Sequence, residues 1–217
     1  MKFKSLLLAL VITTALAACS DGTASRGPAA GAQPAEAVSA TPAGAVTPTV
    51  ALIEASTKGF SAGSLMSAQT FYVFFDAQCS HCGFLWQAFK PLQSQVRVVW
   101  IPVGILNKAS TSQGATLLAA KDPVATMDEH EKLLTARQGG ITADASLSEL
   151  QAVVGKNTEV LKSFGVTSIP YVFGINAKTG ETVTVTGSLP TEALAAKLGL
   201  TLSASAPTSA PAASSAQ

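Results

Sequence analysis

The sequence predicts an α/β protein with one folded domain at residues 49–202. Apolar runs rich in β-branched and aromatic residues alternate there with segments of helical periodicity. The segments on either side, residues 19–48 and 203–217, consist mainly of Ala, Gly, Pro, Ser and Thr. They carry too little apolar surface to offset chain entropy, so we expect a disordered tether before the domain and a disordered tail after it.

Five segments have the composition of strands. The run at 71–75 is apolar at every position, which indicates a strand buried on both faces. Near the end of the domain, a turn-forming segment at 176–180 joins two such segments and predicts a hairpin. Residues 56–69 have no clear pattern. The expected strands are residues 49–54, 71–75, 96–103, 171–175 and 182–186.

Capping signals mark the boundaries of several helices. Asp122 directly precedes Pro123, as an N-cap residue precedes a first-turn proline. Ser146 opens a capping-box pattern for a helix that we expect to be interrupted near Gly155 and to end at Gly165. The expected helices are residues 80–92, 111–121, 123–136, 146–164 and 190–198.

The most informative motif is Cys79-Ser80-His81-Cys82, at the junction between the apolar strand and the next helix. Two residues between cysteines, wound as a first helical turn, bring their Cα atoms within reach of a disulfide. The helix N-terminus favours a thiolate. We therefore expect Cys79, with an exposed sulfur, to act as the nucleophile and the shielded Cys82 to resolve the mixed disulfide. His81 would add positive charge beside the sulfur and act in the same direction.

The start of the chain has the features of an export signal. A basic beginning is followed by an apolar core at residues 6–15 and by Leu16-Ala17-Ala18. Together with Cys19 this ending resembles a bacterial lipobox, which implies removal of residues 1–18 and a lipid anchor on Cys19. Ser20 in the next position favours the inner leaflet of the outer membrane. We expect a periplasmic, lipid-anchored protein; an ordinary signal peptide with a chance cysteine is the alternative.

Cysteine usage and charge narrow the function further. With Cys19 lipidated, the other two of the three cysteines form one pair, and the short loop that they close would add little stability. The pair is therefore expected to serve chemistry. The formal net charge is +1 and no polybasic patch is present, so we expect no nucleic-acid partner.

Metal binding is the main chemical alternative. A zinc site needs about four ligands, and no second cysteine pair is available. A Cu(I) site formed by Cys79, Cys82 and His81 remains open, because soft thiolates select Cu(I). His130, between two glutamates of an expected helix, is predicted to be a solvated surface residue. We expect no metal ligands outside this copper alternative.

The helix after the cysteine motif carries four large apolar side chains, which proteins usually bury. We expect them in the core, with Trp86 the one able to reach the rim of a cleft. They are Phe84, Leu85, Trp86 and Phe89.

Three segments together carry a resemblance to a known family. They are Phe74 to Cys82, Pro102 to Leu106 and Leu118 to Pro123. They resemble the catalytic domain of the periplasmic disulfide isomerases DsbC and DsbG, more closely DsbG. The resemblance implies a thioredoxin-like fold with a helical insertion and a thiol-disulfide oxidoreductase or isomerase without a separate cofactor. It implies protein thiols and disulfides as substrates, together with a membrane or periplasmic redox partner. It also implies that Ile169-Pro170 is a cis-proline loop that pairs with the substrate backbone.

Several features depart from this family. No N-terminal dimerisation domain is expected before residue 49, and Ile169 stands where the isomerases usually have Thr. Val73 occupies the strand position where thioredoxin keeps a buried acid. Asp76 is expected to turn the loop after the strand rather than to accept a proton from Cys82. Oxidase, isomerase and reductase directions therefore remain open.

Overall fold

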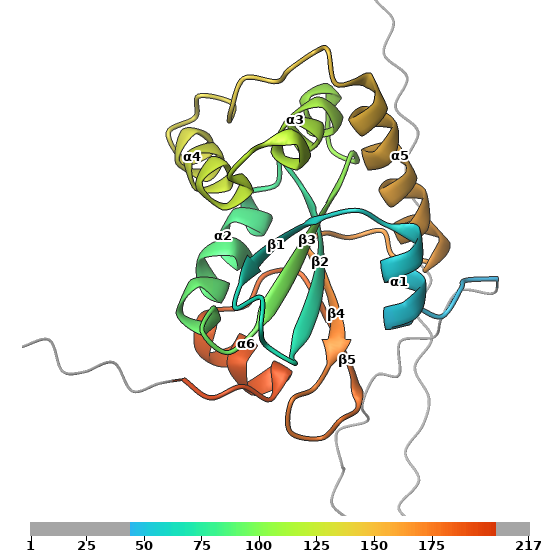
Figure 1. Ribbon diagram of the computed structural model, residues 1–217, viewed down its shortest axis with the longest axis vertical. Helices are drawn as coiled ribbons and strands as arrows, with labels where there is room; N and C mark the ends of the chain where they lie inside the picture. Colours follow the sequence, from blue (N-terminus) through green and yellow to red (C-terminus); the bar gives the residue numbers. More distant parts are fainter. Residues whose placement is uncertain (1–43, 203–217) are drawn as a thin grey trace, which may run out of the picture. The chain divides into compact units, whose positions relative to one another are not determined.

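The computed structural model describes residues 44–202, which form a five-stranded mixed sheet with helices on both faces (Figure 1). The spatial order of the strands is β1-β3-β2-β4-β5. β2 and β3 are parallel, and the other neighbouring pairs are antiparallel. The strands are β1 (Phe60–Gly63), β2 (Thr70–Asp76), β3 (Arg97–Val103), β4 (Tyr171–Ile175) and β5 (Thr182–Thr186).

Helices cover the two faces of the sheet in separate groups. α2 and α6 contribute to one apolar core, and α1 and α5 contribute to the other. α3, α4 and α5 follow one another between β3 and β4, which confirms the expected helical insertion. α3 and α4 pack together, and α4 also contacts α2 (Figure 1). The helices are α1 (Val50–Ser56), α2 (Ser80–Phe89), α3 (Lys108–Ala119), α4 (Pro123–Thr135), α5 (Ser148–Ser163) and α6 (Thr191–Leu198).

The central strand β2 explains how the two cores meet. Its side chains alternate between the faces: Phe71, Val73 and Phe75 enter the core under α2, while Tyr72 and Phe74 enter the core under α1 and α5. All five are at most 2% exposed, as the apolar run predicts. Burial of such side chains stabilises the fold by about 2 kcal/mol each. The loop after β2 therefore begins from a rigid support.

The start of the domain differs from the prediction. Residues 49–54 do not form a strand, because the segment from Val50 is helix α1. Thr49 is its N-cap, and its Oγ1 accepts a hydrogen bond from the backbone N–H of Leu52 at 3.2 Å. The apolar residues of this segment have helical rather than alternating spacing, and Ile53 is the one that becomes fully buried. The edge strand β1 lies in the stretch that had no clear pattern.

The capping signals of the insertion had mixed outcomes. Asp122 caps α4 by accepting from the N–H of Ala125 at 3.0 Å, as predicted. The capping box of α5 was wrong: Ser146 instead bonds to Asp144, and the helix begins without a side-chain cap. α5 also runs through Gly155 without interruption. It ends as expected before a glycine at residue 165 with φ of 72°.

The predicted export signal, the tether and the tail fall largely outside the described residues. Cys19 lies there too, so its lipidation and residues 1–18 as a signal peptide stay predictions. Among helices α1 to α6, none has the length and apolar character that crossing a bilayer requires.

Candidate active site

The two cysteines lie where β2 passes into α2. Cys79 is the N-cap of α2, and its backbone carbonyl accepts from the N–H groups of Cys82 at 3.0 Å and Gly83 at 3.3 Å. Its Sγ accepts from the N–H of Cys82 at 3.2 Å. The sulfur thus takes the place that a Ser or Asp oxygen takes in an ordinary helix cap. Both cysteines are free thiols rather than a disulfide.

The environment lowers the pKa of one thiol and raises the pKa of the other. The pKa of Cys79 is lowered, chiefly by the hydrogen bond from the Cys82 thiol and further by backbone N–H groups of Cys82 and His81, although burial opposes this. Burial raises the pKa of Cys82, and the hydrogen bond to Cys79 and the charge of Cys79 raise it further. Cys79 is 6% exposed and Cys82 is fully buried. The expectation of an exposed Cys79 sulfur was too strong, but Cys79 is the more accessible of the two.

Asp76 holds the loop before Cys79 in place. Its Oδ1 accepts from the N–H of Gln78 at 2.8 Å, and its Oδ2 accepts from the N–H groups of Ile105 at 2.7 Å and Leu106 at 2.9 Å. The side chain is 1% exposed, so its charge is met by backbone dipoles rather than by water. Asp76 joins the loops that follow β2 and β3, in agreement with the predicted turn role.

The insertion also fastens this loop, through His130 of α4. The Nε2 of His130 contacts the carbonyl of Ala77 at 2.5 Å, and its Nδ1 accepts from the N–H of Ile141 at 3.2 Å. Because Nδ1 is an acceptor, Nε2 carries the proton and the ring is neutral. Burial lowers the pKa of His130. The prediction of a solvated surface residue was wrong, since His130 is fully buried.

The cis-proline loop lies against the same core. The Ile169–Pro170 peptide bond is cis, as the family resemblance implied. Ile169 packs on the apolar cluster that contains both cysteines. The carbonyl of Pro170 accepts from the N–H of Gly187 at 2.8 Å, and the next residue, Ser188, contacts Nδ1 of His81 at 3.2 Å. The His81 ring thus faces the loop after β5, and its backbone N–H is the part that bonds to the Cys79 sulfur.

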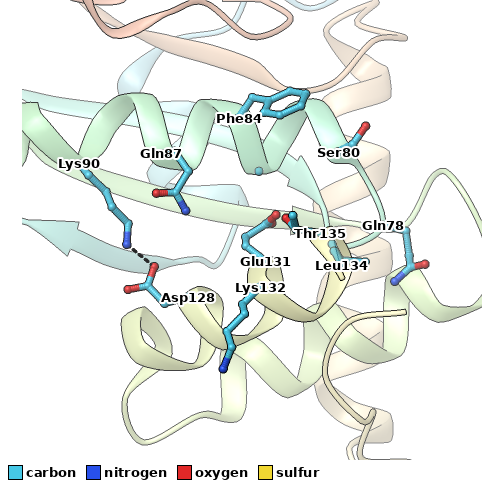
Figure 2. Close-up of a pocket in the computed structure, with 11 residues that line it drawn as sticks. Gln78, Ser80, Phe84, Gln87, Lys90, Asp128, Glu131, Lys132, Leu134 and Thr135 are labelled. Atoms are coloured by element: carbon cyan, nitrogen blue, oxygen red, sulfur yellow. Dashed lines mark ion pairs between the residues drawn. The ribbon is translucent and has the colours of Figure 1, made fainter. Parts of the chain in front are cut away.

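A pocket of about 690 Å³ opens between α2 and α4 beside the cysteine pair (Figure 2). Ser80 and Gly83 of α2 line it, and Glu131 points into it from α4. Phe84 also lines the pocket and is 63% exposed, which corrects the expectation that it lies in the core. Trp86 is fully buried and donates from Nε1 to Asp128 at 2.7 Å, so it does not reach the rim.

Glu131 is the site residue that the sequence did not predict. It is 7% exposed, and burial followed by the charge on Cys79 raises its pKa to about 8. The helical pattern of α4 offered one signal, because Met127, His130 and Glu131 fall on a common buried face at spacings of three and four residues. An acid on such a face is a candidate functional group.

Few potential metal ligands lie close together in the described part of the chain. Within residues 44–202, no cluster of three or more His, Cys, Asp or Glu side chains has the geometry of a metal site. Cys79 and Cys82 lie together, but the His81 ring contacts Ser188.

Comparison with known proteins supports the family resemblance. No protein-family model matches the chain. The thiol:disulfide interchange protein DsbG of Pseudomonas aeruginosa is 31% identical over 113 residues, which are 49% of this chain and 42% of that protein. DsbG of Escherichia coli is 26% identical over 104 residues, 47% of this chain and 42% of that protein. The matched part thus spans less than half the length of these curated relatives.

Solved structures agree on the fold. The crystal structure of DsbA2 from Pseudomonas aeruginosa has a TM-score of 0.51 at 19% identity and covers 64% of this chain and 91% of that chain. A periplasmic thioredoxin-like protein from Salmonella enterica serovar Typhimurium has a TM-score of 0.51 at 17% identity and covers 70% and 97%. The fold and the site define the class, a thioredoxin-fold protein with a Cys-x-x-Cys pair. Within that class the chain is similar to the DsbG thiol:disulfide interchange proteins, which confirms the resemblance drawn from the sequence.

Proposed function

We propose that the protein is a thiol-disulfide oxidoreductase of the bacterial cell envelope that exchanges disulfides with other proteins through Cys79 and Cys82. The observation that carries this proposal is the difference between the surroundings of the two cysteine sulfurs at the start of α2. One sulfur is held at a helix N-cap by hydrogen bonds that lower its pKa, and its partner is a buried thiol one turn later. This is the arrangement that a nucleophile and a resolving thiol need.

The exchange has two steps. The Cys79 thiolate attacks one sulfur of a substrate disulfide; the new Cys79–substrate bond forms and the second substrate sulfur leaves with the bonding electrons. The Cys82 thiol then loses its proton and attacks the Cys79 sulfur, which releases the first substrate sulfur and closes the Cys79–Cys82 disulfide. The substrate gains two electrons, and the protein loses two. The reverse sequence oxidises a substrate dithiol.

Exposed apolar residues beside the pair fit non-native polypeptides as substrates. Phe84 is 63% exposed, Leu106 is 51% exposed and Ile105 is 38% exposed. The last two belong to the loop that Asp76 holds against the active site. Exposed apolar groups of this kind mark interaction surfaces. Ile169-Pro170 would align the substrate backbone, and the ring of His81 would tune the Cys79 sulfur.

The compartment and the partners follow from the chain's similarity to DsbG and from its first residues. We place the protein in the periplasm, anchored through lipidated Cys19, with the inner leaflet of the outer membrane favoured by Ser20. A membrane or periplasmic redox protein would reset the pair after each turnover. The exchange needs no separate cofactor, because electrons pass directly between sulfurs.

Two activity assays test the proposal on the full chain. Reduction of insulin and refolding of scrambled ribonuclease should both proceed with the wild type, and Cys79→Ser should lose at least about 1000-fold because a hydroxyl cannot replace the thiolate. Ser80→Ala, which alters the neighbouring exposed residue and leaves both sulfurs, is the matched control. Full turnover by Cys79→Ser would reject the proposal.

A copper-handling protein on the same fold is the rival function. Two adjacent thiols are present for Cu(I), although His81 would have to turn away from Ser188 to join them. Titration of the reduced protein with Cu(I) against a chelator separates the two functions. Tight stoichiometric binding without any disulfide exchange would favour copper handling.

A further inference from the structure

Glu131 lies closer to the redox pair than its position in the sequence suggests. A Cβ added to Gly83 would stand 2.0 Å from its Oε2, so the carboxyl packs directly on the backbone of the first turn of α2. Gly83 immediately follows Cys82. The close approach is possible only because residue 83 has no side chain.

No hydrogen bond from residues 44–202 satisfies this carboxyl. Burial and the charge on Cys79 are the influences that act on it, and neither is a hydrogen-bond donor. A buried carboxylate without donors or a cation is unfavourable, so the group holds its proton more tightly than a free glutamate does. Its carboxyl faces the pocket that Ser80 also lines (Figure 2), and Ser80 directly follows Cys79 in the chain.

The other charged groups around the pocket are already paired. Lys90 of α2 bonds to Asp128 of α4 at 2.6 Å, and Lys132 bonds to Glu129 at 3.2 Å. From α3 and β1, which also pack against α4, no titratable side chain lines the pocket. The charge of Cys79 therefore acts on Glu131, and Asp76 is the acid whose charge acts on Cys79.

We propose that Glu131 transfers the protons that the two steps of disulfide exchange require. This inference rests on the exchange function proposed above. Burial, and after it the charge of the Cys79 thiolate, keeps Glu131 protonated in the reduced protein. Formation of the mixed disulfide removes the Cys79 charge, which weakens the hold of Glu131 on its proton, and Glu131 gives that proton through the pocket to the departing substrate thiolate.

The second step uses the carboxylate that the first step leaves. The Glu131 carboxylate accepts the proton of the Cys82 thiol through water as Cys82 attacks the Cys79 sulfur. The Cys79–substrate bond breaks, and the substrate sulfur leaves as a thiolate. Glu131 therefore ends the cycle with the proton that Cys82 has lost. One proton and two electrons leave the pair: the electrons reside on the two substrate sulfurs, and the first of these sulfurs to leave carries the proton that Glu131 gave.

Rapid-quench kinetics with a peptide disulfide test the proposal, because mass spectrometry separates reduced, mixed-disulfide and oxidised protein. Glu131→Gln should form the mixed disulfide and then resolve it about 100-fold more slowly than the wild type at pH 7, a loss within the usual range for general acid–base catalysis. The wild-type resolution rate should rise with pH through an inflection below about 8 that the variant lacks. Glu131→Asp should recover part of the rate.

The control is Glu129→Gln, which removes an exposed acid from the same helix and should resolve the mixed disulfide at the wild-type rate. A folded Glu131→Gln protein with wild-type resolution at every pH would overturn the inference while leaving the exchange function intact. Absence of any mixed disulfide in the wild type would reject the exchange function itself.

A measurement on the wild type covers the case in which the variants do not fold. Asp76 and Glu131 are the buried acids of residues 44–202, so ¹³C-labelled glutamate identifies the Glu131 carboxyl in an infrared spectrum. The reduced protein should show a protonated glutamic acid band at pH 7, and this band should disappear at a lower pH in the oxidised protein, which lacks the Cys79 charge. A band that is absent from the reduced protein at pH 7, or that disappears at the same pH in both redox states, would overturn the inference.

Discussion

Two buried acids flank the cysteine pair, and their surroundings are opposite. Asp76, in the loop after β2, accepts three backbone N–H groups at 2.7 to 2.9 Å. Glu131, on α4, receives no hydrogen bond from the described residues and packs on Gly83. Both are less than a tenth exposed. Burial alone therefore does not decide what an acid does; the hydrogen-bond donors around it decide whether it holds loops together or is available to exchange a proton.

The largest effect is expected from removing Asp76, the acid that accepts three backbone hydrogen bonds. Asp76→Ala leaves the N–H groups of Gln78, Ile105 and Leu106 without their acceptor, and we expect the free energy of unfolding to fall by about 4 kcal/mol. Urea denaturation measures it. Asp122→Ala, which removes an exposed helix cap with one N–H, should cost about 1 kcal/mol. Equal losses in the two variants would show that Asp76 does not hold the loops after β2 and β3 together.

Glu131, the acid to which no residue of 44–202 donates a hydrogen bond, should instead reveal itself through the pH dependence of stability. The pKa of Glu131 is raised to about 8 in the folded protein from 4.5, so its contribution to stability is complete below pH 4.5 and is lost as pH rises toward 8. From pH 5 to 8 the stability of reduced Glu131→Gln should therefore improve relative to wild type by roughly 3–4 kcal/mol. In the oxidised protein the gain should be smaller, because Cys79 then carries no charge. A pH-independent difference would contradict the raised pKa.

The smallest effect concerns the neighbouring residue, His130, whose pH dependence has the opposite sign. Its pKa is lowered from 6.5, so its contribution is complete above pH 6.5 and declines as pH falls below that value, when protonation would cost Nδ1 its bond from Ile141. We expect a loss of about 1 kcal/mol between pH 6.5 and 5.5 that His130→Asn does not share. His81→Asn, which alters the exposed histidine, should retain the loss. Identical pH profiles for wild type and His130→Asn would be inconsistent with a buried neutral ring.

The parts of the fold that the sequence predicted are those in which local pattern and tertiary packing agree. Strand β2 is apolar on both faces, at every position from residue 71 to residue 75, because both faces of the sheet are covered there. The Cys79 motif lies where this strand passes into helix α2. Where a short segment was compatible with both a strand and a helix, its packing in the fold determined which one formed. Residues 49–54 became helix α1 because Thr49 caps it and Ile53 fills a core position.

The candidate site was predictable for the cysteines and not for the groups that control their protons. Cys79, Cys82 and the Ile169–Pro170 loop carry motifs, whereas His130 and Glu131 lie in a polar helical sequence that suits a surface. Glu131 is buried where α4 packs against Gly83 of α2, and His130 is buried against the loop at Ala77 and against Ile141. The contacts with Gly83 and Ala77 join residues about fifty positions apart, for which no local pattern exists. Phe84 illustrates the reverse error, since an aromatic residue in an apolar helix remained exposed.

The missing side chain at residue 83 couples two places in the chain. As long as a glutamate occupies position 131, even a methyl group at position 83 would collide with its Oε2. A larger residue at position 83 would displace the Glu131 carboxyl from the first turn of α2, so a redesign of Gly83 would also change the surroundings of Glu131. Among homologous sequences, larger residues at the first position should accompany shorter or smaller ones at the second.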